Sequence, residues 1–253
     1  MTVASGFSRT SAIVGLVLAL VAPATLIAQR GGPPAPAKAS APIDLTGYWV
    51  AVVNEDWRFR MVTPPKGDYR GVPITLEALK IVNAWDPAAD DAAGNQCKSY
   101  GAAAIMRVPG RIHITWQDDN TLKLDADAGT QTRLFRFGDA PPAAGPPTWQ
   151  GNSVARWDRP GGRGGAPRGG SLNVVTTNMR AGYLRKNGVP YSESTRLTEH
   201  FDVAPAPNGG QLLVVTTVID DPRYLTQQLI LSPHFKKEAD GSKWDPTPCS
   251  STW

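Results

Sequence analysis

The chain has 253 residues and a formal net charge of +4, so it is long enough for one large domain and only mildly basic. It contains no basic helix and no nucleic-acid-binding motif, and this argues against a nucleic-acid partner. Its two cysteines and three histidines are scattered and lack the spacing of a metal site. We therefore expect no metal and no other cofactor.

Residues 1–28 have the pattern of a secretory signal peptide. Arg9 gives a positive start, residues 11–21 are apolar, and small residues follow, with cleavage expected near Ala24 or Ala28. The apolar run is too short to span a bilayer, so we expect no stable membrane anchor, a retained anchor being the weaker alternative. The pattern predicts a periplasmic or secreted protein.

The next segment, residues 29–42, is rich in Ala, Pro and Gly and predicts a disordered leader. A single domain is expected over residues 43–253. The run from Leu45 to Val53 alternates as a strand does, and the pattern of residues 57–62 predicts a second strand. One helix is expected from about Leu76 to Trp85, with Thr75 as its N-cap.

Strand patterns dominate the rest of the chain. Residues 111–137 contain three runs separated by turns, which predict a meander of hairpins, and five further runs follow. A flexible loop rich in Gly and Arg is expected at residues 159–170. About nine strands and one short helix indicate an all-β fold, an antiparallel β-barrel of eight to ten strands or, as the alternative, a sandwich. A barrel of this size can hold one small ligand.

Cys97 and Cys249 are the only cysteines in the chain. An oxidising compartment would allow them to form a disulfide, which would tie the C-terminal tail to the middle of the sequence. Two free thiols or a metal pair are the alternatives. We expect the disulfide.

Several segments carry a resemblance to known proteins. The motif D-L-T-G-Y-W, residues 44–49, resembles the G-x-W opening of lipocalin-type barrels, in which the tryptophan closes the bottom of the barrel. A longer resemblance runs through C-K-S-Y-G-A-A-A-I-M-R-V-P-G-R-I-H-I, P-T-W-Q-G-N-S-V-A-R-W, Y-L-R-K-N-G-V-P-Y-S-E-S-T-R-L-T-E-H-F and V-I-D-D-P-R-Y. Through these segments the chain resembles a large family of exported bacterial proteins with a lipocalin- or calycin-like β-barrel and no settled function. The resemblance implies export and a barrel, and it implies no reaction.

Glu199 is the first candidate for a catalytic residue. In a strand, Leu197, Glu199 and Phe201 share one face, so a barrel interior would surround the carboxylate with apolar side chains. A desolvated carboxylate can act as a general acid or base. The alternative is a structural ion pair with an interior arginine such as Arg133 or Arg156.

His113 is the candidate acid/base partner of Glu199. It alternates with Ile112 and Ile114 in its strand. If the polar face of this strand lines a cavity, His113 faces the ligand. If the isoleucine face is the interior, His113 is an ordinary histidine on the outer surface.

Candidate ligand-binding residues are mainly aromatic. Small residues between two tryptophans would leave room for a ligand in the barrel wall, and a later loop offers groups for the rim of the barrel mouth. The full set is Trp116, Trp149, Ser153, Trp157, Tyr183, Tyr191 and Glu193.

Two functions are compatible with these patterns. The first is an exported β-barrel that binds a small hydrophobic or aromatic ligand. The alternative is a metal-independent acid/base enzyme of the lyase, isomerase or hydratase type, acting on a small hydrophobic substrate in the barrel cavity. The fold alone does not decide between the two functions. The absence of a strong catalytic motif favours binding.

Overall fold

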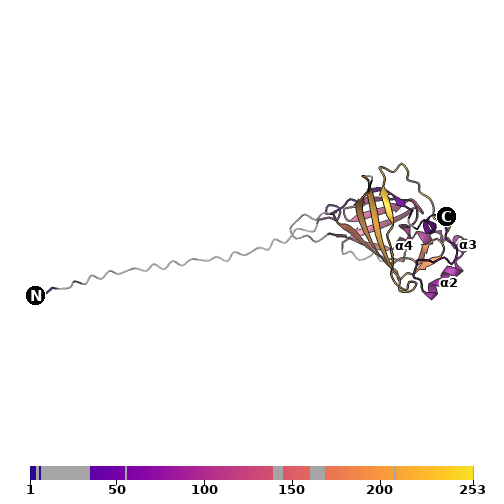
Figure 1. The fold of residues 1–253 in the computed structure, drawn as a ribbon, viewed down its shortest axis with the longest axis horizontal. Helices are drawn as coiled ribbons and strands as arrows, with labels where there is room; N and C mark the ends of the chain where they lie inside the picture. The colour runs from indigo at the N-terminus through magenta and orange to yellow at the C-terminus, as the bar shows by residue number, and fades with distance from the viewer. Residues whose placement is uncertain are drawn as a thin grey trace. The chain divides into compact units, whose positions relative to one another are not determined.

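The structure is a computed structural model, which describes residues 1–3, 6, 35–54, 56–138, 145–159, 169–207 and 209–252. The chain divides into two units, Met1–Pro34 and Ala35–Trp253, and the helices and strands belong to the second (Figure 1). The expected signal peptide lies almost wholly outside the described residues. So does most of the expected Gly/Arg-rich loop.

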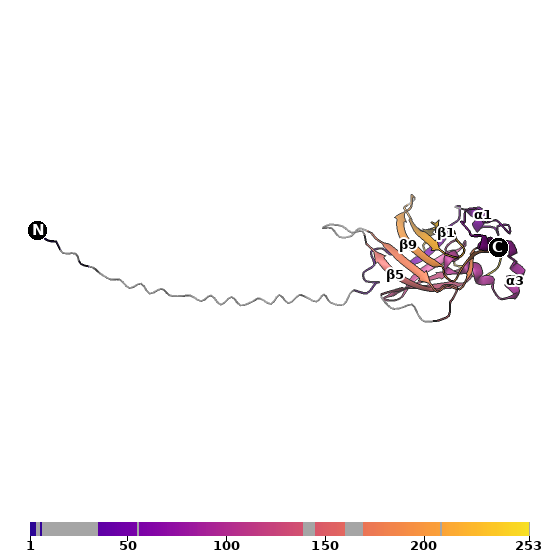
Figure 2. The ribbon, with the colours of Figure 1, turned by 90° about the horizontal axis from the view of Figure 1, so that it is seen from below.

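Nine strands of the described residues close into a β-barrel (Figures 1 and 2). In order around the barrel they are β1 (Gly47–Val52), β2 (Arg111–Asp118), β3 (Thr121–Ala126), β4 (Gln131–Phe137), β5 (Asn152–Asp158), β6 (Ser171–Thr177), β9 (Arg196–Pro205), β10 (Gln211–Asp220) and β12 (His234–Lys237). Strand β11 (Leu229–Leu231) pairs with the far end of β10, while β7 (Gly182–Arg185) and β8 (Val189–Tyr191) form a separate hairpin. The expected all-β barrel is confirmed.

The strands are not all antiparallel, as we had expected. β4 and β5 run parallel, with Phe135 opposite Ser153, whereas every other strand pair described is antiparallel. An antiparallel pair needs only a tight turn, but a parallel pair needs a crossover of about a dozen residues. β5 begins at Asn152, 15 residues after β4 ends at Phe137, which is long enough for such a connection. The barrel is therefore of mixed orientation.

The helices also differ from the expectation of a single one. The expected helix is present as α2 (Leu76–Ala84), and Thr75 accepts a hydrogen bond from the Ala78 N–H at 3.2 Å. The described residues contain four more short helices, which gather with it at one end of the barrel (Figures 1 and 2). They are α1 (Trp57–Arg60), α3 (Pro87–Ala92), the 3₁₀ helix η1 (Gln96–Tyr100) and α4 (Ala102–Ile105).

The strand expected at residues 57–62 was wrong. This stretch contains α1, and Arg60, which the alternation set opposite Trp57, Phe59 and Met61, is buried. Its guanidinium donates hydrogen bonds to the carbonyl oxygens of Val52 and Arg107, at 2.8 and 2.9 Å. These contacts hold the arginine inward, and a local pattern of alternation cannot encode them.

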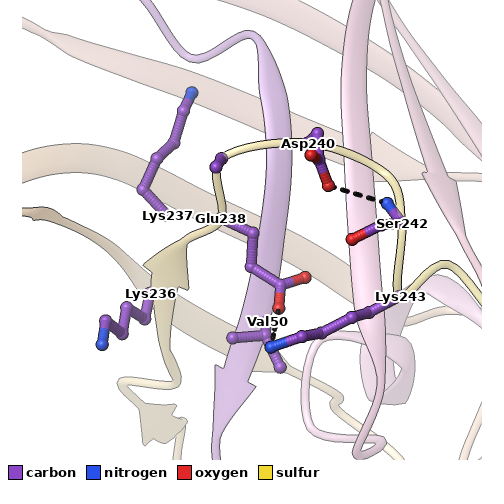
Figure 3. Close-up of a pocket in the computed structure, with 8 residues that line it drawn as sticks. Val50, Lys236, Lys237, Glu238, Asp240, Ser242 and Lys243 are labelled. Carbon is purple, nitrogen blue, oxygen red and sulfur yellow. Dashed lines mark hydrogen bonds and ion pairs between the residues drawn. The ribbon is translucent and has the colours of Figure 1, made fainter.

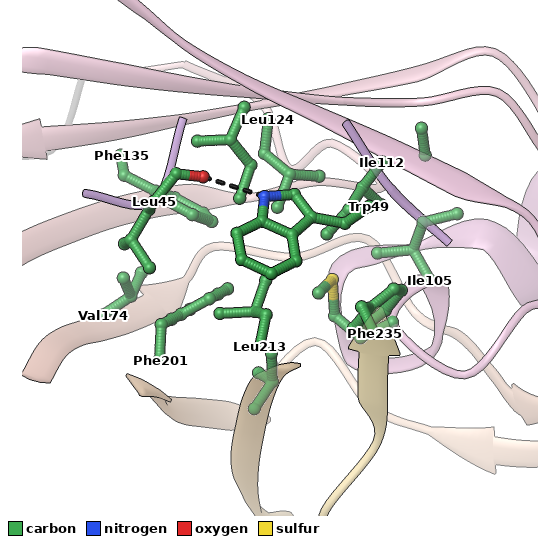
Figure 4. Close-up of a cluster of buried hydrophobic side chains, with 14 of the residues drawn as sticks. Leu45, Trp49, Ile105, Ile112, Leu124, Phe135, Val174, Phe201, Leu213 and Phe235 are labelled. Atoms are coloured by element: carbon green, nitrogen blue, oxygen red, sulfur yellow. Dashed lines mark hydrogen bonds between the residues drawn. The ribbon is translucent and has the colours of Figure 1, made fainter. Parts of the chain in front are cut away.

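Trp49 lies at the centre of the larger hydrophobic core (Figure 4). Its indole N–H donates a hydrogen bond to the carbonyl oxygen of Leu45 at 2.9 Å. Buried apolar side chains from the other eight strands surround it: Ile112, Ile114, Leu122, Leu124, Phe135, Ala155, Leu172, Val174, Phe201, Leu213, Val215 and Phe235. Side chains therefore pack the barrel interior at this level, as is usual in small barrels.

A second core closes the end of the barrel where the helices lie. It joins α2, α4 and the β7–β8 hairpin to the ends of β9 and β10. Its buried members are Val72, Val82, Ala102, Ala103, Met179, Leu184, Val189, Tyr191, Leu197, Ile219, Leu225 and Leu229. One end of the barrel is therefore covered by packed structure.

The ordered barrel unit begins before the expected boundary at residue 43. Ala37 is buried, and its N–H donates a hydrogen bond to Asn120 Oδ1 at 2.9 Å. The Ala37 carbonyl accepts a hydrogen bond from the Trp157 indole at 2.9 Å. Residues 35–42 therefore belong to the barrel and are not a disordered leader. The first part of the expected leader, residues 29–34, lies outside the described residues.

The expected disulfide is confirmed. Cys97 in η1 is bonded to Cys249, 152 residues later, with a Cα–Cα distance of 5.1 Å. In the chain-entropy model, a loop of this length stabilises the folded state by about 5 kcal/mol. Within the described part of the chain, no helix is long and apolar enough to cross a membrane.

Candidate functional site

Glu199 faces the barrel interior together with Leu197 and Phe201, as expected. Its carboxylate accepts two hydrogen bonds from the guanidinium of Arg133, Nη1 to Oε1 at 3.0 Å and Nη2 to Oε2 at 2.5 Å. The two side chains are 0% and 1% exposed. Of the two interpretations offered by the sequence, the geometry provides the ion pair with Arg133. Arg156, the other possible partner, is exposed and pairs with Asp158.

The Arg133–Glu199 pair belongs to a polar layer inside the barrel. Thr176 accepts a hydrogen bond from Arg133 Nη2 at 3.3 Å and shares another with Ser153 at 2.7 Å. The Arg133 guanidinium also lies over the Phe135 ring, 4.9 Å from its centroid. A buried ion pair needs such supporting contacts to offset the desolvation of its charges. Ser153 and Glu199 therefore belong to one hydrogen-bond network. Within it, Glu199 is bonded to Arg133 and Ser153 to Thr176.

His113 lies on the opposite side of the sheet from Glu199. Ile112 and Ile114 are buried in the barrel core, so the alternation of β2 directs His113 outward. The hypothesis of an acid/base pair of His113 and Glu199 in one barrel cavity was therefore wrong. The physical reason is that the isoleucine face is the one that the core buries.

The predicted ligand-binding tryptophans do not converge on one cavity. Trp116 and Trp157 lie near Phe137, with ring centroids 5.7 and 5.3 Å from that ring, and form a half-buried cluster. Trp149 lies elsewhere, and the guanidinium of Arg180 lies over its ring, 4.3 Å from the ring centroid. The rings of Trp116, Phe137 and Trp157 therefore pack against one another.

The predicted rim residues also separate. Tyr183 donates a hydrogen bond to Asp90 Oδ2 at 2.9 Å, and burial together with this carboxylate raises the pKa of its hydroxyl. Tyr191 is fully buried in the second core, and Glu193 is exposed. The sequence had placed all three at a barrel mouth. Of the three, Glu193 is exposed, Tyr183 is half-buried and Tyr191 is buried.

A different set of residues forms a row on the outer face of the barrel. Tyr48, His113, Asp125 and Thr132 lie directly opposite one another across β1, β2, β3 and β4. The rings of Tyr48 and His113 stack in parallel, with centroids 3.9 Å apart. Trp244, from the C-terminal segment, meets both rings edge-on, at 5.8 and 6.2 Å.

This row borders a groove of about 220 Å³, which we call the outer groove. It is lined by Tyr48, His113, Asp125, Ala126, Thr130, Gln131, Thr132, Trp244 and Pro246. The segment of residues 238–246 forms one wall by crossing β1 closely. A Cβ added at Gly241 would lie 2.6 Å from Cζ of Tyr48, so only glycine permits this approach.

The electrostatics of the outer groove favour a neutral His113. Burial lowers the pKa of its imidazole and Lys123 lowers it further, while Asp125 opposes the shift. Asp125 accepts a hydrogen bond from the Thr132 hydroxyl at 2.7 Å and pairs with Lys123 at 2.8 Å. The groove therefore combines an aromatic wall with a polar edge.

A second hollow, of about 390 Å³, is lined mainly by residues of the same C-terminal segment and of β12 (Figure 3). Val50 lines it, and the rest of its lining is mostly charged. Glu238 accepts a hydrogen bond from Arg111 at 2.8 Å and lies 3.9 Å from Lys243. Figure 3 shows Lys237 directed away from Lys243. Because its lining contains no aromatic side chain, whereas the outer groove has Tyr48, His113 and Trp244, we take the outer groove as the candidate site.

Sequence reasoning found His113 but missed Tyr48 and Trp244. Tyr48 could have been found, because an inward Trp49 requires an outward Tyr48 in the same strand. Trp244 has no such local signal, since its position depends on the path of the C-terminal segment. The described residues contain no group of three or more His, Cys, Asp or Glu placed to hold a metal ion.

No protein-family model and no curated protein matches the chain. The fold and the groove therefore carry the functional argument.

Proposed function

We propose that this protein is an exported β-barrel that binds a small molecule with an aromatic or apolar face in the outer groove. The observation that carries the proposal is the arrangement of Tyr48, His113 and Trp244, whose ring centroids lie within 6.2 Å of one another beside a hollow. Aromatic side chains bind planar ligands through stacked and edge-on contacts. Three rings from two strands and a crossing segment make such a surface.

The size of the groove restricts the ligand. A volume of about 220 Å³ is below the roughly 300–1,000 Å³ of pockets that take drug-sized molecules. The groove thus suits a compound with a single ring. Asp125, Gln131 and the neutral imidazole of His113 offer hydrogen-bonding groups for hydroxyl or amino substituents on such a ring.

The packing of the barrel supports an outer site over an inner one. Trp49, Phe135 and Phe201 are fully buried in the interior, and the second core covers one end. A ligand in the interior would have to displace these side chains, at a cost of disrupted packing. The outer groove needs no such displacement.

The acid/base enzyme remains the second candidate, and the geometry favours it less. Its carboxylate was Glu199, which is fully buried and bonded through both oxygens to Arg133. A general acid or base has to come within hydrogen-bond reach of its substrate. His113 alone would have to carry that chemistry in the outer groove.

The expectation of export is part of the proposal. The Cys97–Cys249 disulfide supports it, because such bonds persist in oxidising compartments. The pattern of residues 1–28 agrees with a signal peptide. We also propose that the chain is related to the exported bacterial barrel proteins, because several of its segments resemble theirs.

A panel of substituted and unsubstituted single-ring aromatic compounds tests the proposal. Calorimetric titration of the mature protein should identify a binder, and Trp244→Ala should raise its Kd by about thirtyfold, equivalent to ~2 kcal/mol. The matched control is Trp57→Ala, which removes an exposed tryptophan in α1, outside the groove lining. Equal affinity in the wild type and Trp244→Ala would contradict the proposed site.

A further inference from the structure

Positively charged side chains gather where α1 meets the β7–β8 hairpin. Arg60, Arg185 and Lys186 are 3%, 9% and 3% exposed, and the side chain of Arg107 is 13% exposed. Charged side chains are rarely buried without partners of opposite charge.

Two of the four cations are bonded to neutral groups. Arg60 donates to the carbonyl oxygens of Val52 and Arg107. The Lys186 ammonium donates to the Tyr100 hydroxyl at 2.5 Å and lies over its ring. These contacts help to solvate the two cations.

Arg185 is the least satisfied of the cluster. Its guanidinium lies over the Phe59 ring, 4.1 Å from the centroid. Its Nη1 is buried and has no hydrogen-bond partner among the described residues. A buried charge without such partners is costly for the folded state.

The nearby carboxylates do not compensate for this charge. Asp56 is half exposed and pairs with Arg107 at 3.3 Å. Asp68 pairs with Arg58 at 3.0 Å and with Arg70 at 3.2 Å. The described carboxylates near Arg185 are thus already shared among other cations.

The electrostatic effect on Arg185 is large. Burial and, after it, the repulsion from Arg107 lower the pKa of the Arg185 guanidinium to about 10, although Asp56 and Asp68 oppose the shift. Arginine normally keeps a pKa above 12. The protein environment alone therefore holds this cation unfavourably, and a bound negative charge would relieve it.

A hollow of about 20 Å³ lies beside this cation. It is lined by Phe59, Ser99, Ala104, Arg107, Val108, Leu184, Arg185 and Lys186. A space of this size admits one group about as large as a water molecule. Three of the lining residues carry a positive charge, and the lining contains no carboxylate.

We propose that Arg185 and Arg107 bind a small inorganic anion, about the size of chloride, in this hollow. A water molecule there could accept a hydrogen bond from Nη1 but would leave the charge of Arg185 uncompensated. An anion satisfies both the hydrogen bond and the charge. The hollow is too small to enclose a whole phosphate or sulfate.

Thermal unfolding of the mature protein in sodium chloride and in sodium gluconate at equal ionic strength tests the proposal. Bound anion stabilises only the folded state, so we expect Tm to be higher in chloride by roughly 3 °C or more when chloride greatly exceeds its Kd. Bromide should have the same effect, and its anomalous scattering in a crystal should give a peak beside Arg185.

Two variants locate the effect. Arg185→Met removes the charge and keeps the bulk, so it should fold at least as well in gluconate and lose the Tm difference between chloride and gluconate. Arg156→Gln, which changes an exposed arginine on β5, should keep the full difference. If Arg185→Met fails to fold, the wild-type crystal with bromide tests the proposal. A peak beside Arg185 supports it, and no peak there contradicts it.

Three results would overturn the proposal. One is an equal Tm in chloride and gluconate. Another is a chloride effect that Arg185→Met retains, since the anion would then bind elsewhere. The third is stabilisation by phosphate but not by chloride or bromide, because the hollow is too small for phosphate.

Discussion

Arg133 holds both carboxylate oxygens of Glu199 inside the barrel, at 3.0 and 2.5 Å, and neither side chain is more than 1% exposed. The pair spans the interior from β4 to β9, two strands that are not neighbours in the barrel. It therefore links two parts of the wall that β5 and β6 separate. We regard Glu199 as a structural residue, and the consequences of this interpretation can be measured.

Glu199→Gln should destabilise the protein by about 3–5 kcal/mol, because it leaves the buried charge of Arg133 without its partner. Urea unfolding of the mature protein measures this loss. The double variant Arg133→Met/Glu199→Leu removes both charges and should recover most of the stability. A Glu199→Gln protein as stable as the wild type would show that the pair is not structural.

The pKa of His113 predicts a dependence of stability on pH. Because burial lowers the folded-state pKa below the ordinary 6.5, the unfolded chain binds the proton more readily between these two values. His113 thus stabilises the fold fully above the unfolded-state pKa, and this contribution is lost as the pH falls below about 6.5 towards the folded pKa. His113→Gln should show a weaker loss of stability between pH 7.5 and pH 5.5 than the wild type.

Nuclear magnetic resonance titration of the His113 ring gives the direct measurement. The wild-type pKa should lie below 6.5. Asp125→Asn should lower it further, because the Asp125 carboxylate is the group that opposes the shift. A pKa that rises in Asp125→Asn would contradict this description of the outer groove.

Gly241→Ala should impair the outer groove and leave the barrel intact. The added Cβ would lie 2.6 Å from Cζ of Tyr48, so the C-terminal segment or the ring has to move, and with it Trp244. We expect ligand affinity to fall while the strand signal in far-UV circular dichroism is unchanged. The control is Gly210→Ala, where the nearest atom to the new Cβ lies 3.9 Å away. Unchanged affinity in Gly241→Ala would argue against this wall of the groove.

The elements that the sequence predicted well are those with local causes. Period-two alternation and turn residues determine β2, β3 and β4, and Thr75 determines the start of α2. The inward face of β9 also follows from Leu197 and Phe201. In these cases each residue and its near neighbours in the chain contain the information.

The features that sequence reasoning missed depend on distant segments. Arg60 is turned inward by carbonyl groups of Val52 and Arg107. The parallel pairing of β4 and β5 depends on a crossover and not on the pattern of either strand. The outer groove exists because Trp244, near the end of the chain, packs against Tyr48 of the first strand. No period within one strand can indicate such a contact.

The location of a bound aromatic ligand tests the central claim most directly. Carbon-13 chemical shifts of the aromatic side chains can be followed while a single-ring ligand is added to the mature protein. We predict that the signals of Tyr48, His113 and Trp244 change together and saturate at one Kd, while those of Trp49 and Phe135 in the barrel interior stay in place. Saturating changes at Trp49 and Phe135, with Trp244 unaffected, would place the ligand inside the barrel and contradict the outer-groove site.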